Sequence, residues 1–231
     1  MSEGASPGGW PQVDPEGRPV RFTLDDPRPR VEEREPVLAG AAVRLEPLRE
    51  THLEALCRIG LEPSVTRFMP IQLRSPKDML AYIRDAVTAR AAGTAIPLVM
   101  ALTTEAETVV GTTRFMNIDL KNRHMEIGST WIGLPWQRTR VNTEAKYLML
   151  RHAFEERGCL RIEFKTDSLN ERSRSALLRI GAVQEGVFRS HVITDEGRIR
   201  HSVYFSITAD EWPEVRLHLE RLLSRPPGES A

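Results

Sequence analysis

The feature that most constrains this chain is the order of its predicted elements between residues 126 and 182, where strand, loop, helix, strand and helix follow closely. The spacing of apolar residues predicts these elements at residues 124–132, 137–141, 142–157, 160–166 and 171–180. At the start of a helix the first N–H groups have no partner within the helix, and the helix dipole is positive. A strand that leads through a loop into such a helix therefore predicts a cradle for an anionic group.

The patterns on either side extend this unit into a single mixed domain. Further strands are predicted at residues 43–47, 96–103, 108–120, 183–194 and 199–208, and further helices at residues 50–61, 75–92 and 209–223. Short polar links between the three strands that end at residue 132 indicate an antiparallel meander, and residues 195–198 (Asp-Glu-Gly-Arg) predict a hairpin. This order favours one α/β (α+β) domain over residues 37–226, followed by a C-terminal tail at 227–231.

The first 36 residues differ in composition from the rest. They hold seven of the 16 Pro and four of the 15 Gly residues of the chain. Because Pro and Gly at this density interrupt helices and strands, we interpret residues 1–36 as an N-terminal extension. A role for this Pro-rich arm in assembly stays open as an alternative, and the sequence also leaves a homodimer open.

The composition argues against several classes of protein. The 32 Lys and Arg residues balance 32 Asp and Glu residues, whereas binders of nucleic acid or anionic membranes usually concentrate positive charge, so we expect neither partner. The longest apolar stretch, residues 95–102, is too short to span a bilayer, and the first residues do not resemble a secretory signal. Cys57, Cys159 and the six histidines lack metal-site spacing. We therefore expect a cytoplasmic protein with reduced thiols and no metal.

Two places in the unit at 126–182 carry candidate side chains for anion binding. In the loop, Arg138 and Arg140 offer donors that suit phosphate geometry, and Asn142 is the predicted N-cap of the helix that follows. On the next helix, Ser173 falls on the buried face within the first turn, and Asn170 is the predicted cap. A hydroxyl there can donate to a developing anion. A bond from the Ser173 hydroxyl to nearby backbone is the open alternative.

Five runs of residues follow one another in a specific order. They are 126–131 (Glu-Ile-Gly-Ser-Thr-Trp), 142–146 (Asn-Thr-Glu-Ala-Lys), 151–154 (Arg-His-Ala-Phe), 170–173 (Asn-Glu-Arg-Ser) and 181–186 (Gly-Ala-Val-Gln-Glu-Gly). Over about residues 40–224 this order resembles the GNAT superfamily of N-acetyltransferases, specifically its ribosomal-protein N-terminal acetyltransferase-like (RimJ/RimL-type) branch. The resemblance implies a mixed, splayed central sheet of about seven strands flanked by helices. It also implies acetyl-CoA wedged between two parallel strands that start near Glu126 and Leu160.

The resemblance assigns residues to the coenzyme as well. Ile127, Ser129 and Trp131 would pair with the pantetheine arm through their backbone, and Asn170 would orient that arm or Ser173. The pyrophosphate would lie over Gln137, Arg138, Thr139, Arg140, Val141, Asn142 and Thr143. This loop departs from the family pattern, which has small residues at the positions of Arg140 and Asn142. Because glycine permits close approach and positive φ more easily than arginine, we expect a different path or phosphate contacts through side chains.

The acetyl transfer implied by the resemblance needs a base and a donor to the departing sulfur. Glu126 is the first candidate for the base, acting directly or through a water, and a structural bond to neighbouring groups is its alternative. His124 and Asp119 are weaker candidates. Ser173 is the candidate donor to the sulfur, a role similar to one proposed for this branch of the family.

The acceptor cleft of this branch is lined by segments that correspond here to Phe68 and Met69 and to Arg189 and His191. Phe68 and Met69 equally suit ordinary core contacts. We predict an acetyl-CoA-dependent N-acetyltransferase in which a primary amine, such as a protein N-terminal α-amine, attacks the thioester directly. A transferase for polyamines, amino-sugars or antibiotics and a non-catalytic acyl-CoA-binding sensor or scaffold are the alternatives.

Overall fold

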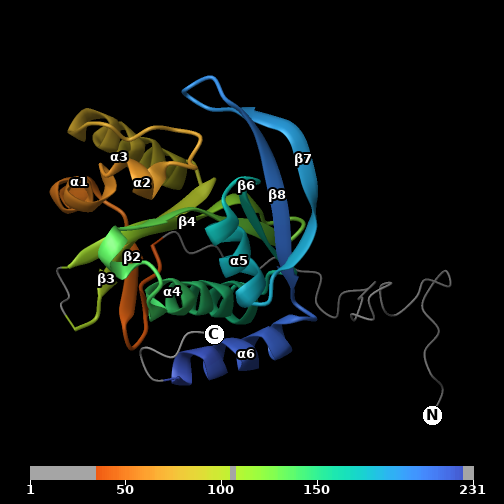
Figure 1. The fold of residues 1–231 in the computed structure, drawn as a ribbon. Coiled ribbons are helices and arrows are strands. Elements are labelled where there is room, and N and C mark those ends of the chain that lie inside the picture. The colour runs from red at the N-terminus through yellow and green to blue at the C-terminus, as the bar shows by residue number, and fades with distance from the viewer. Residues whose placement is uncertain (1–34, 105–107, 226–231) are drawn as a thin grey trace, which may run out of the picture.

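The computed structural model describes residues 35–104 and 108–225 (Figure 1). The predicted C-terminal tail and nearly all of the predicted N-terminal extension lie outside the described residues. The strands are β1 (Leu38–Ala39), β2 (Val43–Pro47), β3 (Ala95–Leu102), β4 (Val109–Asp119), β5 (His124–Ile132), β6 (Arg161–Asp167), β7 (Val183–Ile193) and β8 (Ile199–Thr208). The α-helices are α1 (Leu53–Gly60), α2 (Pro63–Thr66), α3 (Pro76–Ala91), α4 (Arg140–Arg151), α5 (Glu171–Arg179) and α6 (Trp212–Ser224). Short helical turns are η1 (Glu50–His52), η2 (Leu134–Trp136) and η3 (His152–Glu156).

The strands form one sheet in the order β1-β2-β3-β4-β5-β6-β8-β7. Every neighbouring pair is antiparallel except β5 and β6, which are parallel. The predicted meander is β3, β4 and β5, and the predicted hairpin joins β7 to β8 through Gly197, which has φ +77°. All predicted strands are present. The sheet has eight strands rather than about seven, because the two-residue β1 is too short to show alternation.

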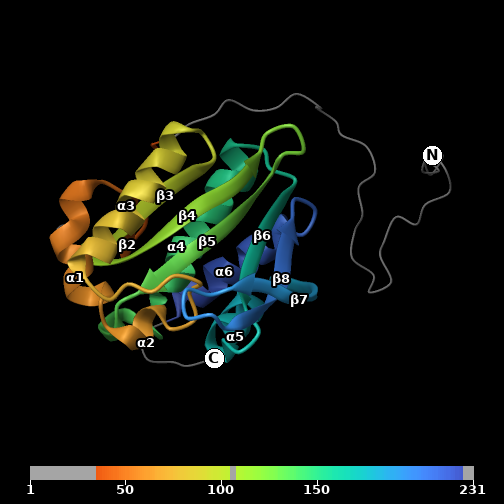
Figure 2. The ribbon, with the colours of Figure 1, turned by 90° about the horizontal axis from the view of Figure 1, so that it is seen from above.

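Helices cover both faces of the sheet. In Figures 1 and 2, α1 and α3 lie on one face, α4 and α6 lie on the other, and α5 stands beside β6. Two hydrophobic clusters match these layers: one includes Leu56, Met79 and Trp131, and the larger one includes Phe115 and Phe164. In the described part of the chain, no helix combines the length and the apolarity that crossing a bilayer requires.

Several predicted helix ends are present. Ser75 is the N-cap of α3, and its Oγ accepts from Asp78 N at 3.2 Å. Helix α4 continues through the π-helical turn η3, and the chain then turns at Gly158, which has the left-handed φ of +65°. Gly181 has φ +93° after α5. These glycines occupy conformations that a side chain would strain.

The N-terminal half of the sheet is tied to α4 by a buried carboxylate. Glu144 accepts hydrogen bonds from the backbone N–H groups of Ala41, Ala42 and Val43 at 2.9, 2.6 and 2.8 Å. A Cβ at Gly40 would stand 2.6 Å from the Glu144 carboxyl carbon, so the turn between β1 and β2 needs glycine there. Glu144 belongs to the run at residues 142–146 that resembles the family, and its contacts are structural.

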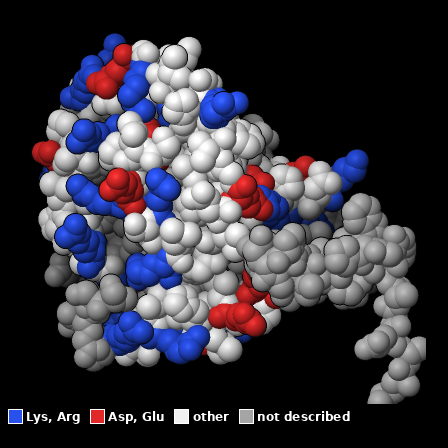
Figure 3. Space-filling model, turned by 45° about the vertical axis from the view of Figure 1, so that its right-hand side comes forward, with Lys and Arg blue, Asp and Glu red and all other residues white. Residues whose placement is uncertain are grey.

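Charges of both signs share the surface shown in Figure 3. Lys and Arg side chains are the more frequent on this face, but Asp and Glu side chains lie among them and a wide area carries neither. Interactions between exposed charges fade over about 10 Å at ordinary salt. Positive potential on this face is therefore interrupted, not gathered into one continuous patch.

Candidate active site

The parallel strands β5 and β6 separate after a short paired stretch. Their register runs only from His124 opposite Arg161 to Glu126 opposite Glu163. Beyond this point lies a cleft of about 1330 Å³, lined by residues of β5, β6, β8, α2, α4 and α5. Small-ligand pockets usually measure about 300–1,000 Å³, so this cleft has room for a long ligand and a second molecule. The expected split between two parallel strands is confirmed.

A β-bulge lies in β5 on the open side. The register of β4 and β5 shifts so that Thr113 alone faces two residues, Ser129 and Thr130, and Ser129 takes φ +48°. A bulge of this kind turns peptide groups away from the regular ladder. The side chains of Ile127 and Trp131 are buried in the two cores. The prediction that these two residues contact the coenzyme through their backbone is consistent with the burial of their side chains.

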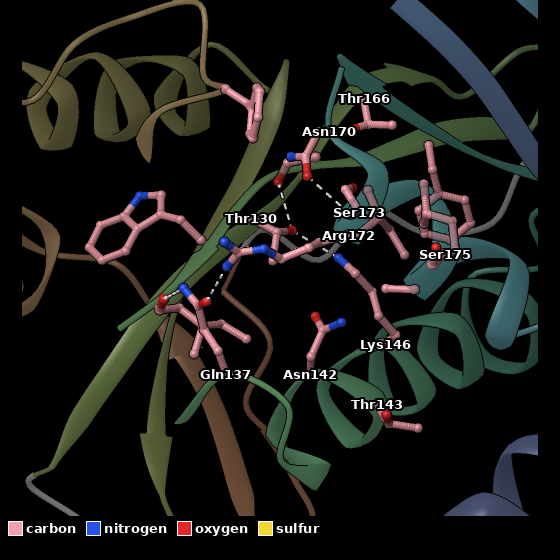
Figure 4. Close-up of a pocket in the computed structure, with 18 of the residues that line it drawn as sticks. Thr130, Gln137, Asn142, Thr143, Lys146, Thr166, Asn170, Arg172, Ser173 and Ser175 are labelled. Atoms are coloured by element: carbon pink, nitrogen blue, oxygen red, sulfur yellow. Dashed lines mark hydrogen bonds between the residues drawn. The ribbon is translucent and has the colours of Figure 1, made fainter. Parts of the chain in front are cut away.

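The start of α4 differs from the prediction. The N-cap is Thr139, whose extended backbone lets its Oγ1 accept from Val141 N at 3.3 Å. The assignment of this cap to Asn142 is wrong, because the helix begins at Arg140, two residues earlier. Asn142 instead lies in the first turn and lines the cleft (Figure 4). The helix N-terminus where the anion cradle is predicted is thus capped by threonine.

The loop before α4 contains a residue in a left-handed conformation, and its expected departure from the family's path stays a prediction. Arg138 has φ +61°, a left-handed conformation that costs a non-glycine residue about 1–2 kcal/mol. Arg140 is helical, and its Nη2 donates to the carbonyl of Leu223 at 2.9 Å. Both arginines line the cleft. Arg138 is exposed and has no ion pair among the described residues, so it is the freer of the two.

Two further arginines of α5 line the same end of the cleft and were not predicted. Arg172 Nη1 donates to Gln137 Oε1 at 3.4 Å, while Gln137 Nε2 donates to the carbonyl of Ile132 at 2.9 Å (Figure 4). Arg179 Nη2 donates to Thr143 Oγ1 at 2.8 Å. The two arginines are seven residues apart, which places them on one face of the helix. The seven-residue spacing was the feature of the sequence that could have identified these two arginines as neighbours.

Lys146 is a buried lysine in the wall of the cleft and was also missed. Its side chain points from α4 towards β5, where Nζ donates to Thr130 Oγ1 at 2.8 Å (Figure 4). Lys146 is 5% exposed, and its Nζ lies 5.9 Å from the centre of the Phe164 ring. Burial lowers the pKa of this amine from 10.5 to about 7. The position four residues after Asn142 would have placed Lys146 on the cleft side of α4.

Ser173 and Asn170 lie where the sequence predicted. Asn170 is the N-cap of α5, and its Oδ1 accepts from Ser173 N at 3.1 Å. Ser173 is half-buried and lines the cleft, while Leu177 and Ile180 on the same helix face are buried. Among the described residues the Ser173 hydroxyl makes no hydrogen bond, so the alternative of a hydroxyl bonded to nearby backbone does not apply.

Glu126 is the last residue of β5 that pairs with β6, and it lines the cleft. It is 3% exposed, and its Oε2 accepts from Asn117 Nδ2 at 2.9 Å and from Lys165 Nζ at 3.3 Å. Its Oε1 makes no hydrogen bond to any described residue. A Cβ at Gly128 would stand 2.8 Å from that oxygen, so the glycine leaves it room. One oxygen is thus held in place and the other is open to the cleft.

The two weaker candidates for the base face each other where β4 ends and β5 begins. His124 Nε2 is 3.5 Å from Asp119 Oδ2, next to the turn between β4 and β5. Asp119 also accepts from the side chain and the backbone of Asn122, and these bonds lower the pKa of its carboxyl. Neither His124 nor Asp119 is among the residues that line the cleft.

The residues predicted for the acceptor separate into two pairs. Phe68 and Met69 line the cleft, although Met69 also packs against the α1–α3 core. Arg189 and His191 lie on β7, outside the lining of the cleft. Arg189 is exposed, and His191 Nδ1 is 3.0 Å from Ser202 Oγ. The neighbouring strand β8 lies between β7 and the cleft, and the role of Arg189 and His191 in binding the acceptor stays a prediction.

The tip of the β7–β8 hairpin lies against the segment between α2 and α3 (Figure 2). Asp195 N donates to the carbonyl of Pro70 at 2.9 Å, and Gln72 N donates to Asp195 Oδ2 at 3.1 Å. Arg74 and Glu196 form an ion pair beside them. The hairpin and this segment belong to opposite halves of the split sheet, so the contact joins the two halves.

The cysteines have the surroundings of inert thiols. Cys159 is buried, and burial raises the pKa of its thiol to about 11. Burial also raises the pKa of Cys57, which is half-buried. Both thiols therefore stay protonated at neutral pH. Within residues 35–104 and 108–225, no group of three or more His, Cys, Asp or Glu side chains is placed to hold a metal ion.

Comparisons with known proteins agree with this geometry. The acetyltransferase (GNAT) domain family matches residues 42–183. A protein of Bacillus subtilis (strain 168) named as a ribosomal N-acetyltransferase, YdaF, is 33% identical over 96 residues, which cover 42% of this chain and about half, 51%, of YdaF. A GCN5-related N-acetyltransferase from Brucella melitensis is 26% identical with a TM-score of 0.79, over 87% of this chain and 91% of that one.

A third similar structure is RimJ of Mycobacterium smegmatis, solved in complex with CoA-disulfide. It is 22% identical, with a TM-score of 0.70 over 84% of this chain and 97% of that one, and shares the fold. The family match covers more than half of the chain and includes β5, α4, β6 and α5, the elements that build the cleft. The chain belongs to the GNAT family of acetyltransferases and is an acyltransferase.

Proposed function

We propose that this chain transfers the acetyl group of acetyl-CoA to a primary amine, including the α-amine of a protein N-terminus. The separation of β5 from β6 beside the start of α4 is the observation that carries the proposal. An unpaired strand edge can bind the amide-containing pantetheine arm as a strand binds its neighbour, and a helix N-terminus suits the pyrophosphate. RimJ, which shares the fold, was solved with a CoA derivative, and this supports the choice of coenzyme.

The residues of the cleft suit the steps of this transfer. The amine nitrogen attacks the thioester carbonyl, the carbon–sulfur bond breaks, and the sulfur leaves as a thiolate. Glu126 takes the proton of the amine directly or through a water, because its Oε1 is open to the cleft. Ser173 donates to the thiolate, because its hydroxyl lies at the N-terminus of α5 without another partner among the described residues.

The ordinary pKa of an amine favours a protein N-terminus as the acceptor. At pH 7 an α-amine with a pKa of about 7.7–8.0 is roughly one-tenth unprotonated, whereas a lysine at about 10.4 is unprotonated in fewer than about one molecule in a thousand. An α-amine therefore needs less help from the enzyme. YdaF is named for ribosomal N-acetylation, which supports the same class of acceptor.

Ser173→Ala tests the transfer directly. Loss of one donor to a developing anion lowers kcat on the order of 10²–10³-fold, and the dissociation constant for acetyl-CoA should change little. Release of CoA with an N-terminal peptide measures kcat, and calorimetry measures binding. Ser224→Ala, at the end of α6 and outside the lining of the cleft, is the matched control. Unchanged kcat in Ser173→Ala would remove the assignment.

The loop before α4 supports a second function, a non-catalytic sensor of acyl-CoA. Arg138 takes its left-handed conformation at an energetic cost, and Arg140 stands where the family has a small residue. Calorimetry with acetyl-CoA and with desulfo-CoA, followed by turnover on a panel of amines, separates the two functions. Tight binding without turnover on any amine favours the sensor.

A further inference from the structure

One face of β6 and β8 is polar where it borders the cleft. Lys165 lies opposite Tyr204, and Asp167 lies opposite Ser202, so these four residues share a face of the sheet. Arg200 precedes Ser202 by two residues on β8 and therefore lies on that face too. Lys165, Asp167 and Arg200 all line the cleft. Charged side chains from two strands thus converge on the end of the cleft away from α4.

The charges on this face are unequally paired. Lys165 Nζ bonds to Glu126 Oε2 at 3.3 Å, and Arg198 Nη2 bonds to Asp167 Oδ2. Arg200 Nε is 3.9 Å from Asp167 Oδ2, which is too far for a hydrogen bond. Asp167 Oδ1 already accepts from the backbone of Leu169 at 3.0 Å. Each carboxylate here has a hydrogen-bonded partner elsewhere, whereas Arg200 has only this longer ion pair and no hydrogen bond to a described residue.

Arg200 is also buried. It is 5% exposed, and its Nε has neither solvent contact nor a hydrogen-bond partner among the described residues. Burial is the largest influence on the pKa of Arg200 and lowers it, while Asp167 and Glu126 act in the opposite direction. A buried charge without a hydrogen-bonded partner is unfavourable, because it has lost its hydration without a full replacement. A ligand that completes the hydrogen bonds of the guanidinium would recover part of that cost.

We propose that Arg200 binds a carboxylate of the acceptor, so that the preferred acceptor carries a carboxylate close to its reactive amine. The inference rests on the proposed acetyl transfer and names its class of substrate. The open oxygen of Glu126 faces the same cleft and attracts the amine, while Arg200 holds the carboxylate. The exposed Arg67 of the segment after α2 lies at the rim of this cleft and has the same sign of charge.

The charge balance favours a carboxylate over a phosphate. Arg200 supplies one positive charge without a hydrogen-bonded partner among the described residues, and a carboxylate supplies one negative charge in the planar form that a guanidinium binds with two parallel bonds. A phosphate dianion would bring its second charge near Asp167 and Glu126, which would repel it. An acidic side chain at the start of a peptide and a small amino acid both supply the required pair of groups.

Matched acceptors test the proposal. Peptides that begin with Asp or Glu are compared with otherwise identical peptides that begin with Asn or Gln, all with amidated C-termini, and a small ω-amino acid is compared with its carboxamide. The wild-type kcat/KM should favour each carboxylate on the order of 10–100-fold. Arg200→Gln should abolish this ratio by slowing only the carboxylate members, and Arg200→Lys should restore part of it. Arg58→Gln, on the exposed surface of α1, removes the same charge and should leave the ratio unchanged.

The outcomes separate this inference from the proposed transfer. If no acceptor is acetylated, calorimetry with CoA present still measures how tightly each carboxylate acceptor and its amide counterpart bind to wild type and to Arg200→Gln. Tighter binding of the carboxylate acceptor to wild type alone supports the anion site. Comparison of the peptide pairs with the amino-acid pair shows whether the preferred carboxylate belongs to a peptide or to a small amino acid. Equal treatment of every pair by wild type, or a preference that survives Arg200→Gln, overturns the proposal. Thermal denaturation monitors folding, and Arg200→Lys serves if the glutamine variant does not fold.

Discussion

One buried glutamate holds the turn between β1 and β2, and another lies in the cleft between β5 and β6. The two carboxylates differ in how many of their oxygens are hydrogen-bonded. Glu144 accepts three backbone N–H groups through both of its oxygens. Glu126 accepts two hydrogen bonds at one oxygen, and its other oxygen is open to the cleft. Since buried polar atoms are nearly always paired, a complete set of partners indicates a structural role. An open atom in a cleft indicates a place that a ligand completes.

Of the substitutions that test this difference, Glu126→Gln should have the largest effect. The amide cannot take a proton from the acceptor amine, so kcat should fall on the order of 10²–10⁴-fold. Acetyl-CoA binding should persist, because the carboxylate lies at the end of the cleft away from α4. Steady-state kinetics with an N-terminal peptide and calorimetry with acetyl-CoA provide the two measurements. A variant with full kcat would show that Glu126 is held only for structure.

Glu144→Gln applies the same substitution to the structural glutamate. An amide has one acceptor oxygen in place of two and adds a donor beside three backbone donors, so the free energy of unfolding should fall by about 3 kcal/mol. The kcat of the folded fraction should stay near the wild-type value. Urea denaturation measures the loss, and Glu126→Gln is the matched comparison. Equal stability losses in both variants would end the distinction drawn between the two glutamates.

Lys146→Met extends the comparison of buried charged groups from the two glutamates to an amine. The pKa of Lys146 is lowered to about 7 in the folded chain, so between pH 7 and 8.5 the unfolded chain binds more protons and wild-type stability should rise with pH. The slope from one group is at most about 1.4 kcal/mol per pH unit. Lys146→Met should flatten that rise and stabilise the fold most below pH 7, where the buried charge is fully present. Equal pH slopes in denaturation of the two proteins would contradict the lowered pKa.

Arg138→Ala combined with Arg140→Ala should have the smallest effect. Exposed charges contribute about 0.2–1 kcal/mol each, so the dissociation constant for acetyl-CoA should rise by about 2–30-fold and depend less on salt. Arg138→Ala alone should account for most of the change, because Arg140 already donates to Leu223. Calorimetry at two ionic strengths measures both quantities. A wild-type salt dependence in the double variant would show that the phosphates bind elsewhere.

Much of the fold follows from the sequence, because long elements bury one face and so show a period. The strands Val43–Pro47, His124–Ile132 and Ile199–Thr208 lie where alternation predicted them. Elements of two to four residues, such as β1 and α2, contain too few residues to show a period and were missed. The cap of α4 was misplaced because Thr139 and Asn142 both suit an N-cap, and only the backbone conformation distinguishes them.

The candidate site was predictable in part. The period of its helix identified Ser173 as a candidate, the resemblance to the family identified Glu126, and both line the cleft. Lys146 and Arg200 were missed, although both are 5% exposed. A charged residue in an amphipathic pattern is normally assigned to solvent. Only the arrangement of distant elements shows that these two side chains turn into an interior space.

The contact between the hairpin tip and the segment after α2 has a consequence for how tightly a ligand can bind. The separated strands are held at one end by the parallel pairing up to Glu126 and at the other by the bonds of Asp195 to Pro70 and Gln72. A gap fixed at both ends keeps its width before any ligand arrives. The conformational entropy of shaping it is then lost once, during folding, instead of at every turnover.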